Sequence, residues 1–368
     1  MVKSFIRCMA SLRLTVISLL VLFVLTAWGT LYQAEHGLFQ AQLRFYQSWF
    51  FLAGGFVPFP GAQLVMSVLF VNLVAAMAPH LFLRPVRWGI LTTHLGLLLM
   101  LVAGAVTYYL GEASRLTLFE GDSSNVATTD HAWELAVWPL SAGGQRDVAA
   151  LDLERLREGR ARPCPAGGFS VMAEEIHANC QPQVGPDGMT MSGLIGMPAR
   201  NEPEDNRPGL VLVVQQEGAE AGRLVLWGGR PMTTELTVAG QVYEFAVRPR
   251  HLPLPFAVQL LDFRKELHPG SYMAKSFSSQ VRVSGGPGPD RKVLISMNRP
   301  LRLQGFTFYQ SSYLTAPDGR EASTFAVVKN HGRLMPYIAT GVTVGGLALH
   351  FLGQLVLRMQ RARRAVSP

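Results

Sequence analysis

Four long stretches of this chain contain no Asp, Glu, Lys or Arg, and this pattern constrains the fold more than any other feature. They lie between Arg13 and Glu35, Arg44 and Arg84, Arg87 and Glu112, and Arg333 and Arg358. A helix needs about 20 apolar residues to cross a bilayer, at a rise of about 1.5 Å per residue. We therefore predict four transmembrane helices, at residues 14–32, 62–83, 88–110 and 335–357.

Basic residues flank these stretches asymmetrically. The N-terminal segment 1–13, the link 84–87 and the tail 358–368 contain basic residues and no acidic ones. Because cytoplasmic ends of membrane helices collect Lys and Arg, we expect these three segments, and so both termini, in the cytoplasm. Residues 33–61 then form a loop at the outer interface, and residues 111–334 form a large periplasmic domain of a bacterial inner-membrane protein.

The overall charge follows from this topology. The net charge is +8 and the pI is 9.7, but the excess of basic residues lies at the cytoplasmic ends of the predicted helices. The sequence therefore indicates a lipid bilayer as one partner and gives no sign of a nucleic-acid-binding surface.

The first apolar stretch could be mistaken for a signal peptide, since it follows basic residues. It is longer than the usual apolar core of about 7 to 15 residues, and Leu25–Tyr32 offers no small-x-small cleavage site. We interpret it as a retained anchor.

The predicted outer loop is rich in aromatic residues between positions 38 and 56 and ends with Pro58 and Pro60. Aromatic rings prefer the membrane–water interface. We expect a short amphipathic connector along that interface. A surface for a flat apolar cofactor is the alternative, and no single residue supports it.

The external region has the pattern of a mostly β domain. Short runs of β-forming residues alternate with Gly, Pro and Asp clusters, at 115–119, 133–138, 169–173, 210–215, 223–227, 242–247, 256–261 and 306–310. Ala239–Gly240 has the composition of a hairpin turn, and residues 148–158 have the pattern of a short helix. One β-sandwich and two smaller β units both fit this pattern.

Cysteine usage fits an exported domain. Cys164 and Cys180 both fall in the external region, which is oxidising if the cell is a Gram-negative bacterium. We expect a disulfide between them, worth about 3 kcal/mol on the chain-entropy model. The sequence contains no C-x-x-C and no C-x-x-C-H, which argues against thioredoxin-type exchange and against a c-type cytochrome.

Two histidines lie inside predicted membrane helices. His94 and His350 fall at similar depth in the cytoplasmic half of two antiparallel helices, and neutral imidazole is the form that ligates iron. Intramembrane ionisable residues are candidates for function, although a hydrogen bond to a neighbouring helix is the ordinary alternative. For the other histidines we expect ordinary solvated or hydrogen-bonded roles: His36, His80, His131, His177, His251, His268 and His331.

Several longer motifs resemble a known family. They are Phe256–Gly270, Lys275–Ser279, Ile295–Leu301 and, most specifically, Gly305–Tyr313, together with Ser48–Phe50, Asn72 and Thr93–Gly96 in the membrane part. This set resembles the ResB family, also called CcsB, of system II cytochrome c biogenesis. The resemblance covers nearly the whole chain and is weakest over residues 122–236.

The resemblance implies a haem-handling subunit. Such proteins work with a CcsA-type partner to carry reduced haem b across the membrane and attach it to apocytochrome c. The family's transmembrane histidine corresponds to His94, while the second membrane ligand comes from the partner, which weakens the case for His350. The tryptophan-rich haem-presenting motif of the partner is absent here. The chain then supplies half of a holocytochrome c synthase, and whether this half is itself catalytic stays open.

Two other functions are compatible with the sequence. A non-haem scaffold would stabilise the partner or receive the apocytochrome. A membrane sensor would bind a small ligand through its external domain, but the eleven residues after Leu357 are too few for an output domain.

Overall fold

The computed structural model describes residues 8–77, 88–140, 147–185, 191–271, 274–286 and 288–366. The chain forms two compact units, a helical unit of Met1–Glu112 with Lys329–Pro368 and a β unit of Ala113–Val328. The basic link 84–87, and the segment 1–7 with Lys3 and Arg7, lie outside the described residues. The predicted orientation therefore stays a prediction.

The helical unit contains the apolar helices expected from the sequence. Three are long and apolar enough to cross a membrane, namely α2 (Leu12–His36), α5 (Trp88–Leu110) and residues Met335–Arg363 of α6 (Met335–Val366). A fourth apolar helix, α4, is described over Ala62–Met77 only, and residues 78–83 of the second predicted span lie outside the described part of the chain. The chain is thus a membrane protein with three candidate membrane-crossing helices in its described part, and the count of four stays a prediction.

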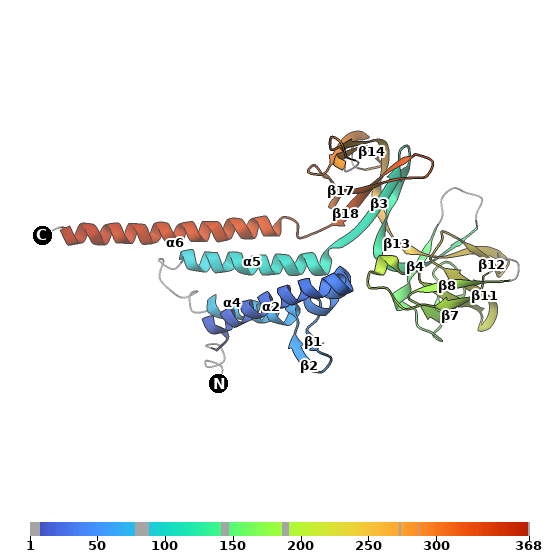
Figure 1. Cartoon of the computed structure of the whole chain (residues 1–368), viewed down its shortest axis with the longest axis horizontal. Helices are drawn as coiled ribbons and strands as arrows, with labels where there is room; N and C mark the ends of the chain where they lie inside the picture. The colour runs from blue at the N-terminus through green and yellow to red at the C-terminus, as the bar shows by residue number, and fades with distance from the viewer. Residues whose placement is uncertain are drawn as a thin grey trace. The chain divides into compact units, whose positions relative to one another are not determined.

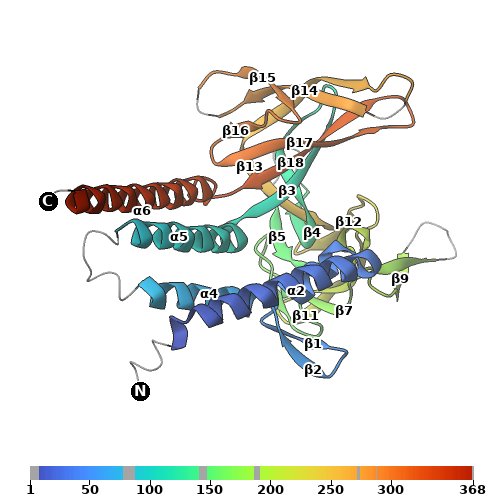
Figure 2. The same ribbon diagram turned by 60° about the vertical axis from the view of Figure 1, so that its left-hand side comes forward.

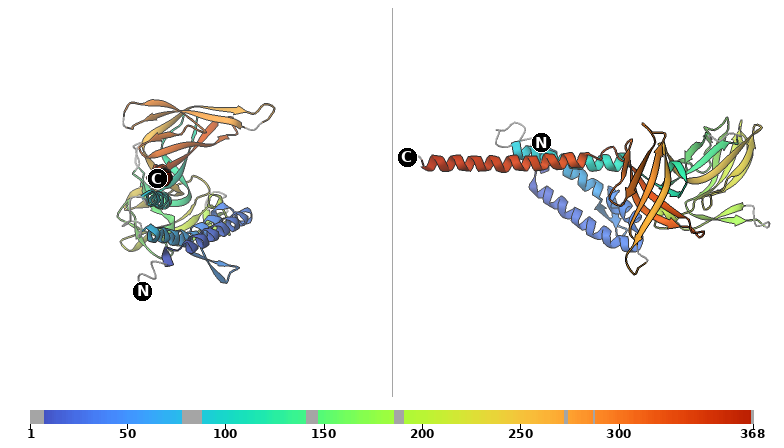
Figure 3. Two further views of the ribbon diagram at one scale, coloured as in Figure 1. Left: turned by 90° about the vertical axis from the view of Figure 1, so that its left-hand side faces the viewer. Right: turned by 90° about the horizontal axis from the view of Figure 1, so that it is seen from above.

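Helices α5 and α6 lie side by side (Figures 1 and 3) and approach closely because glycines face the partner helix. A methyl group on Gly89 would overlap the backbone of His350, and one on Gly346 would overlap the backbone of Thr93. Small residues allow such close contact between membrane helices. Gly89 is the second residue of α5, so α6 continues past His350 with no α5 beside it (Figure 1).

Helices α2 and α4 are joined by a buried polar contact. The Asn72 side chain accepts a hydrogen bond from Thr15 Oγ1 at 2.7 Å and donates to the backbone carbonyls of Met9 and Ser11. Asn72 is 4% exposed. Buried amides need such partners, which explains an asparagine in an otherwise apolar helix.

The connection from α2 to α4 folds into a short helix, a π-turn and a β-hairpin. These elements are α3 (Leu38–Ala41), η1 (Gln42–Tyr46), β1 (Phe50–Ala53) and β2 (Val57–Pro60). One face of the hairpin packs on the helices, where the Trp28 ring lies 5.5 Å from Phe45, 5.6 Å from Phe51 and 5.9 Å from Phe59.

In the described residues of the β unit there are sixteen strands, ten of which form one sheet. Its strands are β3 (Glu112–Phe119), β4 (Ser123–Pro139), β5 (Ala149–Asp152), β6 (Arg162–Pro163), β7 (Ser170–His177), β8 (Cys180–Val184), β9 (Met191–Gly196), β10 (Gly209–Gln216), β11 (Ala219–Trp227), β12 (Thr234–Val238), β13 (Gln241–Leu267), β14 (Ala274–Ser284), β15 (Arg291–Ser296), β16 (Leu301–Leu303), β17 (Phe306–Thr315) and β18 (Glu321–Lys329). Short 3-10 turns, η4 (Leu153–Arg155) and η5 (Pro203–Asp205), interrupt the loops.

The ten-stranded sheet runs in the order β15-β14-β13-β4-β3-β18-β17-β16, with β12 beside β13 and β5 beside β4 (Figure 2). A four-stranded sheet has the order β11-β10-β7-β6, and β8 pairs with β9. Two separate hydrophobic cores result, one around Phe308 and Phe325 and one around Leu212 and Phe245. Strands β4 and β13 are long enough to contribute residues to both cores, so the β unit consists of two modules built on shared strands.

The motif residues behind the family resemblance meet in the first of these cores. The Ser279 hydroxyl donates to Gln310 Oε1 at 2.7 Å, and Gln310 Nε2 donates to Ser323 at 2.7 Å, with all three side chains buried. A fully satisfied buried network favours one arrangement of the strands around it. Phe306 and Phe308 are buried against Phe256, as expected for core aromatics, whereas Tyr309 is exposed.

Two local predictions have opposite outcomes. The Ala239–Gly240 turn is confirmed, because Val238 pairs with Gln241 and both turn residues have positive φ, at 53° and 80°, as a type I′ turn requires. The helix predicted over 148–158 is wrong. Ala149–Asp152 pairs with β4 as strand β5 and only the turn Leu153–Arg155 is helical, since pairing with a sheet outweighs local helix propensity.

The predicted disulfide between Cys164 and Cys180 does not form in the structure, where both are buried free thiols. Cys164 is hydrogen-bonded to Phe169, beside the end of β10 at Gln215, whereas Cys180 is bonded to Arg207, beside the other end at Gly209. The intervening six residues of strand span about 20 Å. A disulfide needs Cα atoms within about 7 Å, so the fold separates the pair.

Both thiols are therefore expected to be present and unreactive in the folded protein. Burial raises the pKa of the Cys180 thiol to about 11 and raises that of Cys164 as well, which keeps the reactive thiolate scarce at neutral pH. In native protein we expect maleimide to modify only the exposed Cys8. In unreduced, denatured protein it should modify three thiols by mass spectrometry, and a count of one would restore the disulfide.

Candidate functional site

His94 lies in the second turn of α5 with its ring held in one orientation. Its Nδ1 lies 2.8 Å from the carbonyl oxygen of Ile90, one turn earlier. A carbonyl can only accept, so Nδ1 carries the hydrogen and donates it. In a neutral imidazole this leaves the Nε2 lone pair available for a metal or another donor. The side chain is partly buried. Thr92 and Thr93 precede it and bond to carbonyl groups of their own helix, and the residues of α5 that follow it are apolar as far as Thr107.

A cavity of about 490 Å³ opens farther along the same helix. Residues of α4 and α5 line it together with two aromatic side chains of the connection, namely Tyr46, Trp49, Met66, Phe70, Met100, Leu101, Gly104, Tyr108 and Tyr109. Across this lining Gln63 Nε2 donates a hydrogen bond to the Tyr108 hydroxyl at 3.2 Å. Leu101 lies seven residues after His94, so the two share one face of α5 about 10 Å apart along its axis. An apolar group in this cavity would lie on the side of α5 that carries His94.

His350 lies on the face of α6 that packs against Gly89 of α5. Its Nδ1 is buried and, among the described residues, has no hydrogen-bond partner. A buried imidazole nitrogen without a partner is uncommon.

The two membrane histidines do not converge. Gly89, which faces α6, and His94 are five residues apart, which places them about 140° apart around α5 at 3.6 residues per turn. His350 therefore lies at the α5–α6 contact and His94 on another face. Within the described ranges no three His, Cys, Asp or Glu side chains form a metal-binding group either. His94 and His350 are therefore not arranged to bind one metal ion together.

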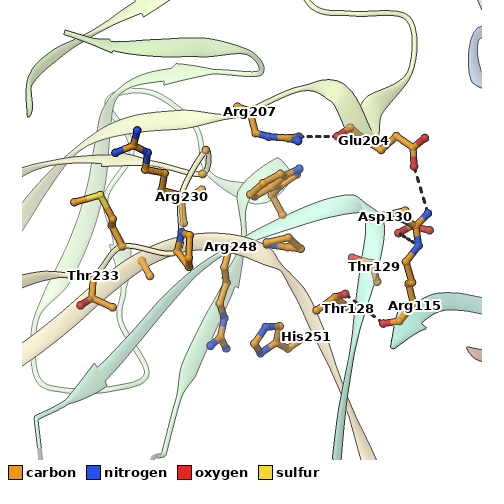
Figure 4. A pocket seen from close by; sticks show the side chains of 18 of the residues that line it. Arg115, Thr128, Thr129, Asp130, Glu204, Arg207, Arg230, Thr233, Arg248 and His251 are labelled. Atoms are coloured by element: carbon orange, nitrogen blue, oxygen red, sulfur yellow. Dashed lines mark hydrogen bonds and ion pairs between the residues drawn. The ribbon is translucent and has the colours of Figure 1, made fainter. Parts of the chain in front are cut away.

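A second cavity, of about 620 Å³, lies in the β unit between the two modules (Figure 4). Arg115 bridges Asp130 at 3.3 Å and Glu204 at 3.4 Å, and Arg248 pairs with the buried Glu134 at 2.9 Å. Two further arginines on the lining, Arg207 and Arg230, have no carboxylate within ion-pair distance in the described part of the chain. They leave the rim of this cavity positively charged.

His251 lines the same cavity beside Arg248. Burial, together with the Arg248 charge, lowers the pKa of His251 from 6.5 to about 4. The imidazole is therefore neutral at physiological pH. No local pattern distinguishes this histidine in the sequence, because its environment is assembled from strands far apart in the chain.

This shift predicts an acid sensitivity of the β unit. In the unfolded chain His251 binds a proton below about pH 6.5, whereas in the folded chain it binds one only near pH 4. The free energy of unfolding therefore falls as the pH drops from 6.5 to 4, and His251 does not affect it above pH 6.5. The variant His251→Gln should flatten that part of the profile of thermal unfolding against pH. Wild-type and variant profiles that run parallel between pH 6.5 and 4 would contradict the assignment.

The structure also reveals side chains that the sequence analysis did not select. Gln63 and Tyr108 meet across the membrane cavity, and Arg207 and Arg230 lie on the rim of the β-unit cavity. A glutamine within an apolar stretch was a visible signal for the first pair. The sequence contains no comparable signal for the two arginines, because surface arginines are common and only the folded structure shows that these two line a cavity.

Comparison with known proteins identifies part of the chain. Residues 211–338 match the model of the ResB-like family. Protein NrfI of Wolinella succinogenes is 31% identical over 117 residues, which make up 30% of this chain and 11% of NrfI. The alignment thus spans only about a tenth of that relative. The family match runs from β10 to the first turn of α6, so His94 and His350 lie outside it.

Proposed function

Because the chain is a ResB-like protein over residues 211–338, we propose that it is a haem-handling membrane subunit in cytochrome c biogenesis. His94 would bind haem b transiently, in complex with a CcsA-type partner that would supply a second ligand to the iron. The complex delivers haem to apocytochrome c. In this proposal both termini are cytoplasmic and the β unit is periplasmic.

The state of His94 is the observation that carries the proposal. Its Nδ1 donates to Ile90 at 2.8 Å, which fixes the ring and leaves Nε2 as a free lone pair, the arrangement common to histidines that bind metals. The neighbouring apolar cavity, with Gly104 where a larger residue would narrow it, suits a flat hydrophobic ligand.

Bound haem would supply the vinyl groups to which cysteine thiols of apocytochrome c are added. The residues of this chain have a more limited task. His94 holds the iron, and the apolar side chains of α4 and α5 exclude water from that side of the ring. Neither role requires a residue of this chain to break a bond, so we propose a non-catalytic half of the synthase.

The test is a reduced-minus-oxidised absorption spectrum of the protein purified in mild detergent, with and without a coexpressed CcsA-type partner. A b-type spectrum that depends on His94 supports the proposal. An intact complex with the partner that lacks haem in every preparation would favour the alternative, a scaffold that stabilises the partner or receives the apocytochrome.

A further inference from the structure

The hairpin formed by β1 and β2 is apolar on both faces. Its inner face packs on the helical unit through Phe51 and Phe59. Its other face and its tip are open, with Phe50 61%, Leu52 52% and Phe56 79% exposed. The chain carries no charge between Arg44 and Arg84. An isolated hairpin of this kind is marginal in water, and its exposed apolar side chains mark an interaction surface.

The backbone of the hairpin is also adapted to a dry environment. Gly61 N–H donates to Trp49 O at 2.8 Å, which makes this a hydrogen-bonded pair of the ladder. Pairs alternate along an antiparallel ladder, so the pairs Phe50–Pro60 and Leu52–Pro58 are the non-hydrogen-bonded ones. Their backbone nitrogens point away from the partner strand. On β2 both of these nitrogens belong to prolines, so this edge exposes no N–H group there.

Arg44 covers the opposite edge. Its Nη2 donates to the outward carbonyl of Leu52 at 2.8 Å, and its guanidinium lies 5.1 Å from the Tyr32 ring centre and 5.6 Å from that of Phe51. No carboxylate pairs with it among the described residues. Arg44 is thus a single cation at the base of an otherwise uncharged hairpin, with donors left for an anion.

We propose that this hairpin is an interfacial anchor that inserts into the bilayer at the headgroup–acyl boundary, with Arg44 binding a phospholipid phosphate. Phe50, Leu52 and Phe56 lie among the upper acyl chains. Full burial in hydrocarbon is excluded because an open strand edge still carries carbonyl groups that need partners. The hairpin connects the end of α2 with the start of α4, which places it at a membrane surface if both helices cross.

The test places a fluorescent nitrobenzoxadiazole label at the hairpin tip in the full-length chain. The variant Phe56→Cys is made with Cys8→Ser, since the two other cysteines are buried, and the protein is reconstituted in phosphatidylcholine nanodiscs. Lipids with a nitroxide near the top of the acyl chain should quench this label several-fold more than aqueous iodide does. Leu52→Cys gives a second position on the open face.

The matched control is Ile195→Cys, because Ile195 is 53% exposed on the two-stranded β8–β9 hairpin of the β unit. It should show the reverse pattern, with strong iodide and weak lipid quenching. Equal iodide quenching of both hairpins would overturn the proposal. Protection of positions 52 and 56 from both quenchers would also overturn it, since protein and not lipid would then cover the surface.

Discussion

Replacing His94 with alanine is expected to lower the b-type haem that copurifies with the protein and its partner by more than tenfold. In the proposed site, removal of the imidazole would take away the iron ligand that this chain provides, while the apolar cavity on the same face of α5 would be unchanged. Axial ligation is the main lever by which a protein holds haem iron. The measurement is the haem content per complex, from the pyridine haemochrome spectrum.

A second variant separates ligation from folding. His94→Gly leaves a space the size of the lost side chain, so millimolar imidazole should restore much of the haem to this variant. Glycine in a helix interior costs only about 1 kcal/mol relative to alanine, and the membrane helix should persist. Failure of imidazole to restore any haem, in protein that still assembles with the partner, would argue for an indirect role of His94.

His36 is the matched control. It lies at the end of α2, and its Nδ1 contacts the carbonyl of Tyr32 one turn earlier at 3.3 Å, as that of His94 contacts Ile90. The His36 ring stacks on the Tyr32 ring with 3.9 Å between their centres, so one face of the imidazole is covered by Tyr32. His36→Ala should retain haem. Equal losses in the His36 and His94 variants would show that haem content reports general damage to the membrane unit.

Adding one methyl group at Gly346 is expected to destabilise the α5–α6 pair by about 1–3 kcal/mol, the usual cost of overpacking. The new Cβ would overlap the backbone nitrogen of Thr93, and a helix backbone cannot move aside as a flexible side chain can. The expected result of Gly346→Ala is a lower midpoint of thermal unfolding in detergent.

The neighbouring glycine provides the control for this substitution. Nothing lies within 4 Å of a Cβ built on Gly345, so Gly345→Ala should be neutral or slightly stabilising through higher helix propensity. The two variants differ by one position and share the same chemistry. Equal effects of both variants on the midpoint would contradict the described packing of α5 on α6.

The sequence predicted those parts of the fold that depend on local patterns. Gaps between charges located α2, α5 and α6, and the Ala239–Gly240 dipeptide located a hairpin turn. The helix predicted over 148–158 failed because β5 is defined by its pairing with β4, a contact that periodicity does not reveal. The predicted disulfide failed for the same kind of reason. The two cysteines lie beside opposite ends of β10, and this separation depends on strand pairing that their spacing in the sequence does not reveal.

The candidate site was predicted in part. Position within an apolar stretch was enough to select His94, but the bond to Ile90 that fixes its ring depends on side-chain orientation. The sequence also suggested similar depths for His94 and His350. It could not show that His350 lies at the α5–α6 contact while His94 lies on another face of α5, because depth along a helix says nothing about the neighbours around it.

Strands β4 and β13 contribute to both cores of the β unit, and this limits how the chain can be divided into fragments. The segment of family similarity, 211–338, contains β13 and β18 but not β3 and β4, which lie between them in the sheet. Expressed alone, that segment would lack the two central strands and expose two long unpaired edges, which are prone to aggregation. We therefore expect that the stretch recognised by similarity does not fold on its own, and that a soluble fragment of this protein must begin before β3.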